Sequence, residues 1–302
     1  MRSLFIAAAL LAAAGQQPVF RVDVRLVRIL ATVKDAAGGL VASLNREDFT
    51  VYDNGVPQEL AVFERRTELP LSIALLVDTS LSTAKELRYE LDSVERFLQA
   101  VFSEGRPEDA VALYSFNYEI TLVSGFTRNH TRLREGLKRL RPEGGTSLYD
   151  AIYLASRDLE MREGRRVMIL VTDGGDTTST KTFHDALEAA HLADTVIYAI
   201  LVMPITSDAG RNIGGENALE GLAAGTGGRV FRPQLGPALD EAFAEILSEL
   251  RTQYLLAYYP RNVPPAKDRF HRVEVRLSNP NLRVLARSGY YEVSERVPKD
   301  RR

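Results

Sequence analysis

The stretch that most constrains the fold runs from Leu71 to Thr83 and reads LSIALLVDTSLST. Its apolar run, Ile73 to Val77, is short and continuous, which is typical of a strand buried on both faces in the middle of a parallel sheet. A carboxylate and two hydroxyls follow at every second position, at Asp78, Ser80 and Ser82. Because open parallel sheets keep their ligand sites at the carboxyl ends of strands, these hard oxygens predict part of a cage for a hard divalent cation.

Strand and helix patterns alternate through the region that follows Pro70 and ends near Arg251. Strands are expected at 71–78, 110–116, 120–123, 167–172, 195–202 and 229–232, and helices at 84–102, 131–140, 147–161, 183–193, 218–224 and 237–250. Thr146 or Ser147 is placed to cap the helix that starts at 147. This alternation predicts an α/β fold with a doubly wound, Rossmann-like, mostly parallel sheet that carries helices on both faces.

The two ends of the chain have strand patterns instead. Strands are expected at 19–33, 49–52 and 58–63, and then at 254–258, 271–277 and 282–286. Asp53-Asn54-Gly55 is a strong hairpin signal between the second and third of them. Each end is too short to fold comfortably alone, so we expect residues 18–68 and 252–302 to pair into one small β-rich domain beside a central domain at 69–251.

The first residues have the layout of a secretory signal peptide. Met1-Arg2 precedes an apolar stretch, Leu4 to Ala14, that ends in small residues. This stretch is shorter than the roughly 20 residues of a membrane span. We therefore expect residues 1–17 to be a cleaved signal peptide, the mature protein to be secreted or periplasmic, and no integral membrane segment to remain; a buried N-terminal helix is the alternative.

Composition removes several classes of function. The chain has no cysteine, which excludes disulfides, thiolate metal sites and cysteine nucleophiles. A formal net charge of −2 argues against a nucleic-acid partner, which would favour a positive excess. The four histidines have no metal-ligand spacing, and the glycines do not form a phosphate-binding pattern.

Two further loops complete the oxygen pattern of the opening stretch. Thr146 lies in a glycine-rich turn before a helix, and Asp173-Gly174 follows the strand at 167–172. In this order and at these intervals, Asp78, Ser80, Ser82, Thr146 and Asp173 resemble the metal-ion-dependent adhesion site of von Willebrand factor type A domains. The resemblance covers roughly residues 70 to 250. A plainer alternative is that the first three residues cap a helix that starts near residue 84.

The resemblance implies a ligand set and a cofactor. Ser80, Ser82 and Thr146 would bind Mg²⁺ (or Mn²⁺) through their hydroxyls, and Asp78 and Asp173 would bind it directly or through water. One coordination position would stay open for an Asp or Glu carboxylate of a protein partner. Mg²⁺ suits such a site because it prefers octahedral oxygen coordination and gives up its waters reluctantly.

This chain also departs from the commonest form of the family. Leu81 stands where glycine is frequent and Thr83 where methionine is. The flanking stretches DFTVYDNGVPQELAVF, TGGRVF, YLLAYYP and ARSGYYE are similar to those of von Willebrand A-related proteins abundant in Acidobacteria.

Together with the expected signal peptide, the resemblance implies an exported protein-binding module, for adhesion or assembly, that is not an enzyme. Two alternatives stay open. A metal-dependent hydrolase would need a general base or nucleophile beside the ion, and none stands next to the motif. A scaffold protein with a non-functional metal site would interact through its β segments. The sequence indicates neither the partner's identity nor the oligomeric state.

Overall fold

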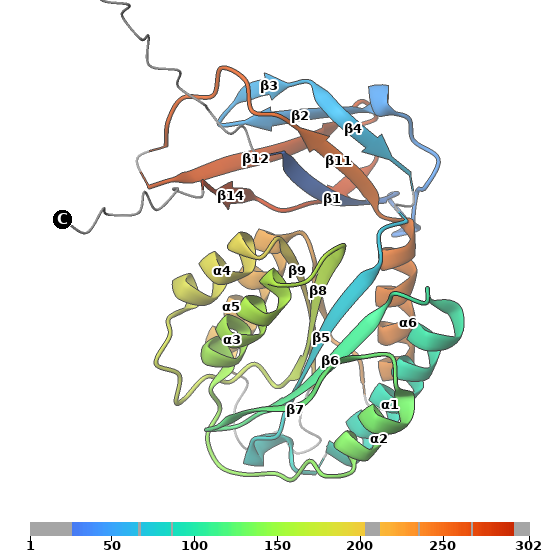
Figure 1. Cartoon of the computed structure of the whole chain (residues 1–302), viewed down its shortest axis with the longest axis vertical. Helices are drawn as coiled ribbons and strands as arrows, with labels where there is room; N and C mark the ends of the chain where they lie inside the picture. The colour runs from blue at the N-terminus through green and yellow to red at the C-terminus, as the bar shows by residue number, and fades with distance from the viewer. Residues whose placement is uncertain are drawn as a thin grey trace, which may run out of the picture.

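The computed structural model describes residues 26–65, 68–85, 87–202, 212–234, 236–266 and 268–292. These residues form a central α/β domain and a smaller all-β domain, placed end to end (Figure 1). The expected signal peptide at 1–17 lies outside the described residues.

A six-stranded sheet is the middle layer of the central domain. Its strands are β5 (Leu71–Asp78), β6 (Ala110–Phe116), β7 (Ile120–Thr127), β8 (Arg165–Thr172), β9 (Thr195–Leu201) and β10 (Val230–Phe231). Their order is β10-β9-β8-β5-β6-β7, and every neighbouring pair is parallel except β6 and β7. All eight residues of β5 are buried, as its apolar run predicts for a central strand.

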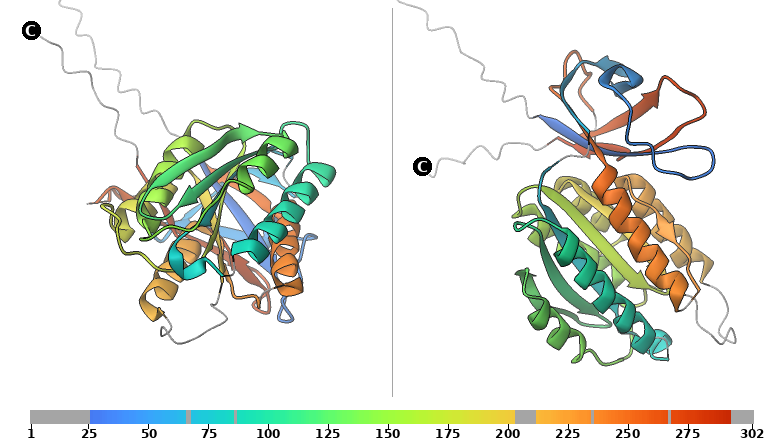
Figure 2. Two further views of the ribbon diagram at one scale, coloured as in Figure 1. Left: turned by 90° about the horizontal axis from the view of Figure 1, so that it is seen from below. Right: turned by 90° about the vertical axis from the view of Figure 1, so that its right-hand side faces the viewer.

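Six α-helices cover the two faces of this sheet (Figure 2). They are α1 (Leu87–Glu104), α2 (His130–Leu137), α3 (Leu148–Glu160), α4 (Phe183–Leu192), α5 (Ile213–Thr226) and α6 (Pro237–Thr252). Alternate residues of β5 enter opposite cores: Ile73 and Leu75 pack in a core with α1, α2 and α6, and Ala74 and Leu76 in a core with α3, α4 and α5. The expected doubly wound fold class is confirmed.

The all-β domain consists of two four-stranded sheets. The first has the order β13-β1-β11-β4 and the second β14-β12-β2-β3. Their bounds are β1 (Val27–Lys34), β2 (Phe49–Asp53), β3 (Val56–Gln58), β4 (Leu60–Glu64), β11 (Tyr254–Tyr258), β12 (Phe270–Leu277), β13 (Arg283–Leu285) and β14 (Gly289–Tyr291), with a 3₁₀ turn η1 (Arg46–Asp48) before β2.

Both sheets combine strands from the two ends of the chain. β11 pairs with β1 and β4, and β12 pairs with β2, all antiparallel. Between the sheets lies an apolar core that includes Ile29, Val51, Tyr254 and Leu256. Neither terminal segment has these partners by itself, so each needs the other to bury its apolar face.

Several elements differ from the expectations. The single strand expected at 58–63 is two strands: β3 closes the Asp53-Asn54-Gly55 hairpin with β2, and β4 leaves for the other sheet after Glu59. Local alternation cannot reveal such a change of sheet. Helix α5 is longer than expected because it starts in the glycines at 214 and 215, which weaken a helical pattern. The short strand β14 was not expected.

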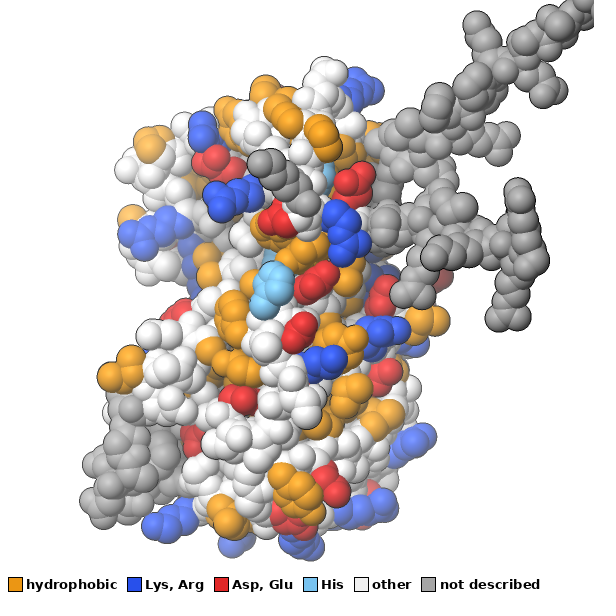
Figure 3. Space-filling view, turned by 90° about the vertical axis from the view of Figure 1, so that its left-hand side faces the viewer, with side chains coloured by type: hydrophobic (Ala, Val, Ile, Leu, Met, Phe, Trp, Pro, Cys, Tyr) orange, Lys and Arg blue, Asp and Glu red, His pale blue; other side chains and the backbone are white. Residues whose placement is uncertain are grey.

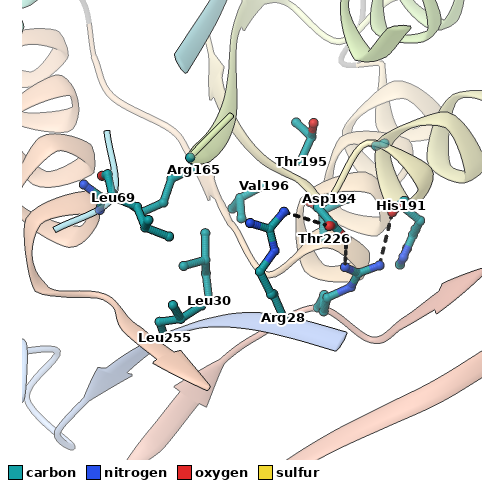
Figure 4. Close-up of a pocket in the computed structure, with 13 residues that line it drawn as sticks. Arg28, Leu30, Leu69, Arg165, His191, Asp194, Thr195, Val196, Thr226 and Leu255 are labelled. Carbon is teal, nitrogen blue, oxygen red and sulfur yellow. Dashed lines mark hydrogen bonds and ion pairs between the residues drawn. The ribbon is translucent and has the colours of Figure 1, made fainter. Parts of the chain in front are cut away.

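The two domains meet at the end of the sheet where β5 begins. Arg287 donates to the main-chain oxygen of His191 (3.2 Å) and pairs with Asp194, to which Arg28 also donates (3.4 Å) (Figure 4). His191 Nδ1 donates to the carbonyl of Gly289 in β14 (2.8 Å). These contacts join α4 to the β domain, while α6 runs into β11 with only Gln253 between them.

None of the described helices combines the length and apolar character that crossing a bilayer requires. On the side of the molecule in Figure 3, basic and acidic side chains are interspersed. This mixing agrees with the near-neutral charge of the chain.

Candidate metal centre

Three loops meet at the end of the central sheet that faces away from the β domain (Figure 1). They follow β5, precede α3 and follow β8. The strands β5 and β8 are parallel neighbours, so their carboxyl ends lie side by side. Ser80 forms a parallel β-bridge with Glu143, which brings the loop before α3 to the same place.

Asp78, the last residue of β5, has no exposed surface. Its Oδ1 accepts from the main-chain N–H of Ser80 (2.8 Å), and its Oδ2 accepts from the hydroxyl of Thr172 (2.6 Å). Burial raises the pKa of this carboxyl from 3.8 to about 6; the hydrogen bonds from Thr172 and Ser80 act against the increase, and the charge of Asp173 adds to it. Asp78 is therefore held in a place where its charge is poorly stabilised by the protein alone.

The loop after Asp78 presents two hydroxyls together. Ser80 Oγ and Ser82 Oγ lie 2.9 Å apart. A 3₁₀ turn, η2 (Leu81–Thr83), places them there. The hydroxyl of Thr83 is buried and donates to the carbonyls of Asp78 and Ser80 (3.2 and 3.0 Å), so Thr83 ties the loop together.

The capping alternative for this loop does not fit the structure. Ser80 is the N-cap of η2, but its side chain makes no capping hydrogen bond. Helix α1 starts only at Leu87. The hydroxyls of Ser80 and Ser82 instead contact each other, and the side chain of Ser80 also forms a hydrogen bond with Asp78.

Thr146 is buried and held by the loop that follows β8. Its N–H donates to the hydroxyl of Thr177 (2.9 Å), and its carbonyl accepts from the N–H groups of Thr177 and Thr178. Thr177 and Thr178 thus support the Thr146 loop. Ser147 is the N-cap of α3 but does not cap it: its hydroxyl contacts the carbonyl of Tyr118 and the hydroxyl of Thr178.

Asp173 completes the group. It is half-buried, and its Oδ1 accepts from the N–H of Gly175 (3.1 Å). A Cβ added to Gly175 would lie 3.4 Å from this Oδ1 and 3.9 Å from the hydroxyl of Thr146, so both side chains face one small space. Gly174 makes the turn possible: its φ is +87°, and Leu201, Leu219 and Gly215 surround the place of a side chain.

The residues present fit a hard divalent cation. Asp78 and Asp173 are like charges that interact, and in the described part of the chain neither forms an ion pair with Lys, Arg or His. Three hydroxyls lie in the surrounding loops. Two carboxylates with neutral oxygens suit Mg²⁺ or Mn²⁺ with retained waters. Among the described residues, no group of three or more His, Asp or Glu side chains is arranged so that it could hold a metal ion.

Two exposed side chains near the centre were not recognised as a pair from sequence. Leu81 is 65% exposed and Tyr118 is 52% exposed. Leu81 lies in η2, and Tyr118 lies in the turn between β6 and β7, where its N–H donates to the carbonyl of Gly144 (3.3 Å). The only sequence signal for Tyr118 is an aromatic residue in a tight turn between two strands.

The fold and these loops define a doubly wound α/β domain with an oxygen-rich centre at the carboxyl ends of its strands. Residues 73–175 match the family model described as the von Willebrand factor type A domain. This range contains all five candidate ligands. This match confirms the predicted resemblance for residues 73–175, and the narrower resemblance to Acidobacterial proteins stays a prediction.

The chain also matches solved structures at low sequence identity. BatB from Bacteroides thetaiotaomicron, a conserved hypothetical protein, is 19% identical, with a TM-score of 0.48 over 60% of this chain and 98% of that one. The vWF domain of the type V pili tip protein Mfa5 from Porphyromonas gingivalis is 14% identical, with a TM-score of 0.49 over 61% and 97%. The SpRpn10 VWA domain is 14% identical, with a TM-score of 0.45 over 59% and 95%. A search of curated proteins found no match.

Proposed function

We propose that this chain is a protein-binding module that captures an acidic residue of a partner through a divalent cation. Asp78, Ser80, Ser82, Thr146 and Asp173 would hold Mg²⁺ or Mn²⁺. When bound, the ion supplies a positive charge with an open position for a carboxylate. The observation that carries this proposal is the pair Asp78 and Asp173, of which the first is fully buried and neither has a cationic partner among the described residues.

The chain's own residues would prepare this capture. Thr172 and the Ser80 N–H hold Asp78 in one orientation, and Thr177 holds the loop of Thr146. A preorganised set of oxygens loses little freedom when the ion binds. The proposal includes binding without turnover, and the alternatives of a hydrolase or a scaffold with an empty site remain outcomes of the test.

A pull-down with the full chain tests the function. A cell-envelope fraction is passed over the immobilised protein in Mg²⁺, and the bound material is eluted with a chelator. We expect chelator-eluted protein from the wild type and from Asp92→Ala, which removes an exposed carboxylate on α1, but none from Asp173→Ala. Equal capture by wild type and Asp173→Ala would favour the scaffold. Steady turnover of a phosphoester or peptide, lost in Asp173→Ala, would favour the hydrolase.

The exported location is a separate part of the proposal. It rests on the apolar stretch Leu4 to Ala14 after Met1-Arg2, outside the described residues. N-terminal sequencing of protein expressed with its own leader tests it: a mature chain that starts near residue 15 to 18 is expected, and an uncleaved chain in the cytoplasmic fraction would contradict it.

A further inference from the structure

The loops around the candidate metal centre carry a second, different kind of surface. The exposed side chains of Leu81 and Tyr118 both border the Gly144-Gly145 turn. A Cβ on Gly144 would lie 3.9 Å from Leu81 Cδ1, and a Cβ on Gly145 would lie 2.9 Å from the Cβ of Tyr118. The two glycines have no side chains and border two exposed apolar groups. We name the surface formed by Leu81, Tyr118, Gly144 and Gly145 the Leu81–Tyr118 floor.

The floor belongs to the same loops as the candidate ligands. Leu81 lies between Ser80 and Ser82, and Gly145 directly precedes Thr146. A partner whose carboxylate reached the ion would therefore bring its neighbouring residues over the floor. Gly145 has a φ of +79°, a conformation that other residues rarely adopt. The backbone geometry therefore also disfavours a residue with a side chain at this position.

Exposed apolar groups beside a functional site have a physical consequence. A leucine and a tyrosine that lose water when a partner binds add favourable free energy in proportion to the apolar area covered. Tyrosine is frequent at the centre of protein interfaces because it offers a large apolar body with a polar end. Single exposed apolar residues are ordinary, but here two of them border one bare strip of backbone.

Acidic side chains flank the tyrosine. Glu119 and Glu143 are both exposed, and their charges raise the pKa of Tyr118, with the larger effect from Glu119. A bound partner would meet negative charge beside Tyr118, which favours a basic group there.

From this arrangement we infer that the partner segment carries, close to its acidic residue, an apolar side chain that lies on the Leu81–Tyr118 floor and a Lys or Arg that faces Glu119 and Glu143. This inference rests on the proposed function and adds the chemistry of the partner to it. The ion selects the partner's carboxylate, the floor selects its apolar side chain, and the two glutamates select its Lys or Arg.

A displayed library of random peptides tests the inference on the full chain. Peptides are bound in Mg²⁺ and eluted with a chelator, and the eluted sequences are compared among variants. For the wild type we expect sequences with an Asp or Glu, an aliphatic or aromatic residue and a Lys or Arg within a few positions of each other. The double variant Leu81→Ser/Tyr118→Ser should keep the acidic preference and lose the apolar one, and Glu119→Gln/Glu143→Gln should lose the basic one.

Affinities of one selected peptide give the size of the effect. Loss of apolar contact with one leucine or tyrosine corresponds to roughly tenfold weaker binding, so the double variant should bind at least tenfold more weakly. The control Met161→Ser removes a side chain that is 84% exposed at the far end of α3 and should bind like the wild type. Since all three side chains are exposed, the variants should melt near the wild-type temperature.

The outcomes separate this inference from the proposed function. Chelator-eluted acidic peptides without an apolar or basic preference, or with preferences that the variants keep, would overturn the inference and leave the metal-dependent function standing. If no peptide elutes with the chelator, the proposed function fails, and the inference fails with it.

Discussion

Replacing Asp78 with Asn gives a prediction whose sign depends on the metal. The change keeps the shape of the side chain and removes its charge. A rise of the carboxyl pKa from 3.8 to about 6 means that the folded protein binds this proton more tightly than the unfolded chain. In metal-free protein the contribution of Asp78 to the free energy of unfolding should therefore fall as pH rises from about 4 to about 6, by roughly 3 kcal/mol in total at about 1.4 kcal/mol per pH unit.

Asn avoids that loss and can keep the hydrogen bonds. The Ser80 N–H can still donate to Oδ1, and the Asn amide can donate to the Thr172 hydroxyl, which is able to accept. We therefore expect Asp78→Asn to raise the free energy of unfolding at pH 7.5 in a chelator by roughly 2 kcal/mol, allowing for the rearranged hydrogen bond. In saturating Mg²⁺ the order should reverse, because at 100 times the dissociation constant only the wild type gains about 2.7 kcal/mol.

Urea unfolding followed by circular dichroism, in chelator and in Mg²⁺, measures both values. Asp109→Asn is a matched control, since Asp109 is also buried but accepts from two main-chain N–H groups, those of Leu71 and Arg106 (both 2.8 Å). An amide leaves one of these donors without an acceptor, so the control should lose about 1–3 kcal/mol in either buffer. If Asp78→Asn lowers the free energy of unfolding in both buffers, as Asp109→Asn should, then the inference that a bound cation stabilises the buried charge of Asp78 is wrong.

Three other changes test the rest of the structure. Lys34→Met removes the β-domain partner (2.8 Å) of the buried carboxylate of Glu249, which keeps Arg229 (2.7 Å), and should lower the free energy of unfolding by roughly 1–3 kcal/mol; equal unfolding of the variant and the wild type in urea would contradict this. Asp53→Ala removes the acceptor of two tyrosine hydroxyls (2.9 and 2.8 Å) and should lower the melting temperature clearly, unlike the exposed control Glu59→Ala; equal melting would refute a structural role. Burial lowers the pKa of His191 from 6.5 to about 4, so the contribution of His191 to stability should rise with pH across that window by roughly 3 kcal/mol. In an Asp78→Asn background, which removes the opposite contribution of Asp78, His191→Gln should flatten this rise in urea unfolding at several pH values; an unchanged slope would exclude His191 as its source.

The sequence predicts where the two candidate carboxylates lie in the fold because each follows a buried strand directly. An apolar run that ends in Asp78, and another that ends in Asp173, place both carboxylates at the same sheet edge by fold rules alone. The position of Thr146 is predicted from a different signal, the glycine-rich turn that precedes a helix. Local patterns also place nearly all the strands and helices of the central domain.

What the sequence does not predict depends on contacts between distant segments. The hydrogen bond from Thr172 to Asp78 joins residues 94 positions apart, and Asp53 meets His271 across 218 positions. Tyr118 reaches the site because its hairpin turn packs on Gly145, which no periodicity encodes. The move of β4 to the first sheet, away from β3, is likewise decided by its pairing with β11.

The most direct test of the central claim is a titration of the full chain with Mn²⁺, in which free Mn²⁺ is counted by electron paramagnetic resonance. We expect one site per chain that competes with Mg²⁺, much weaker binding in Asp173→Ala and Thr146→Ala, and unchanged binding in Asp92→Ala. Absence of binding to the wild type, or binding that Asp173→Ala leaves intact, would contradict the proposal that Asp78, Ser80, Ser82, Thr146 and Asp173 form a divalent-cation site.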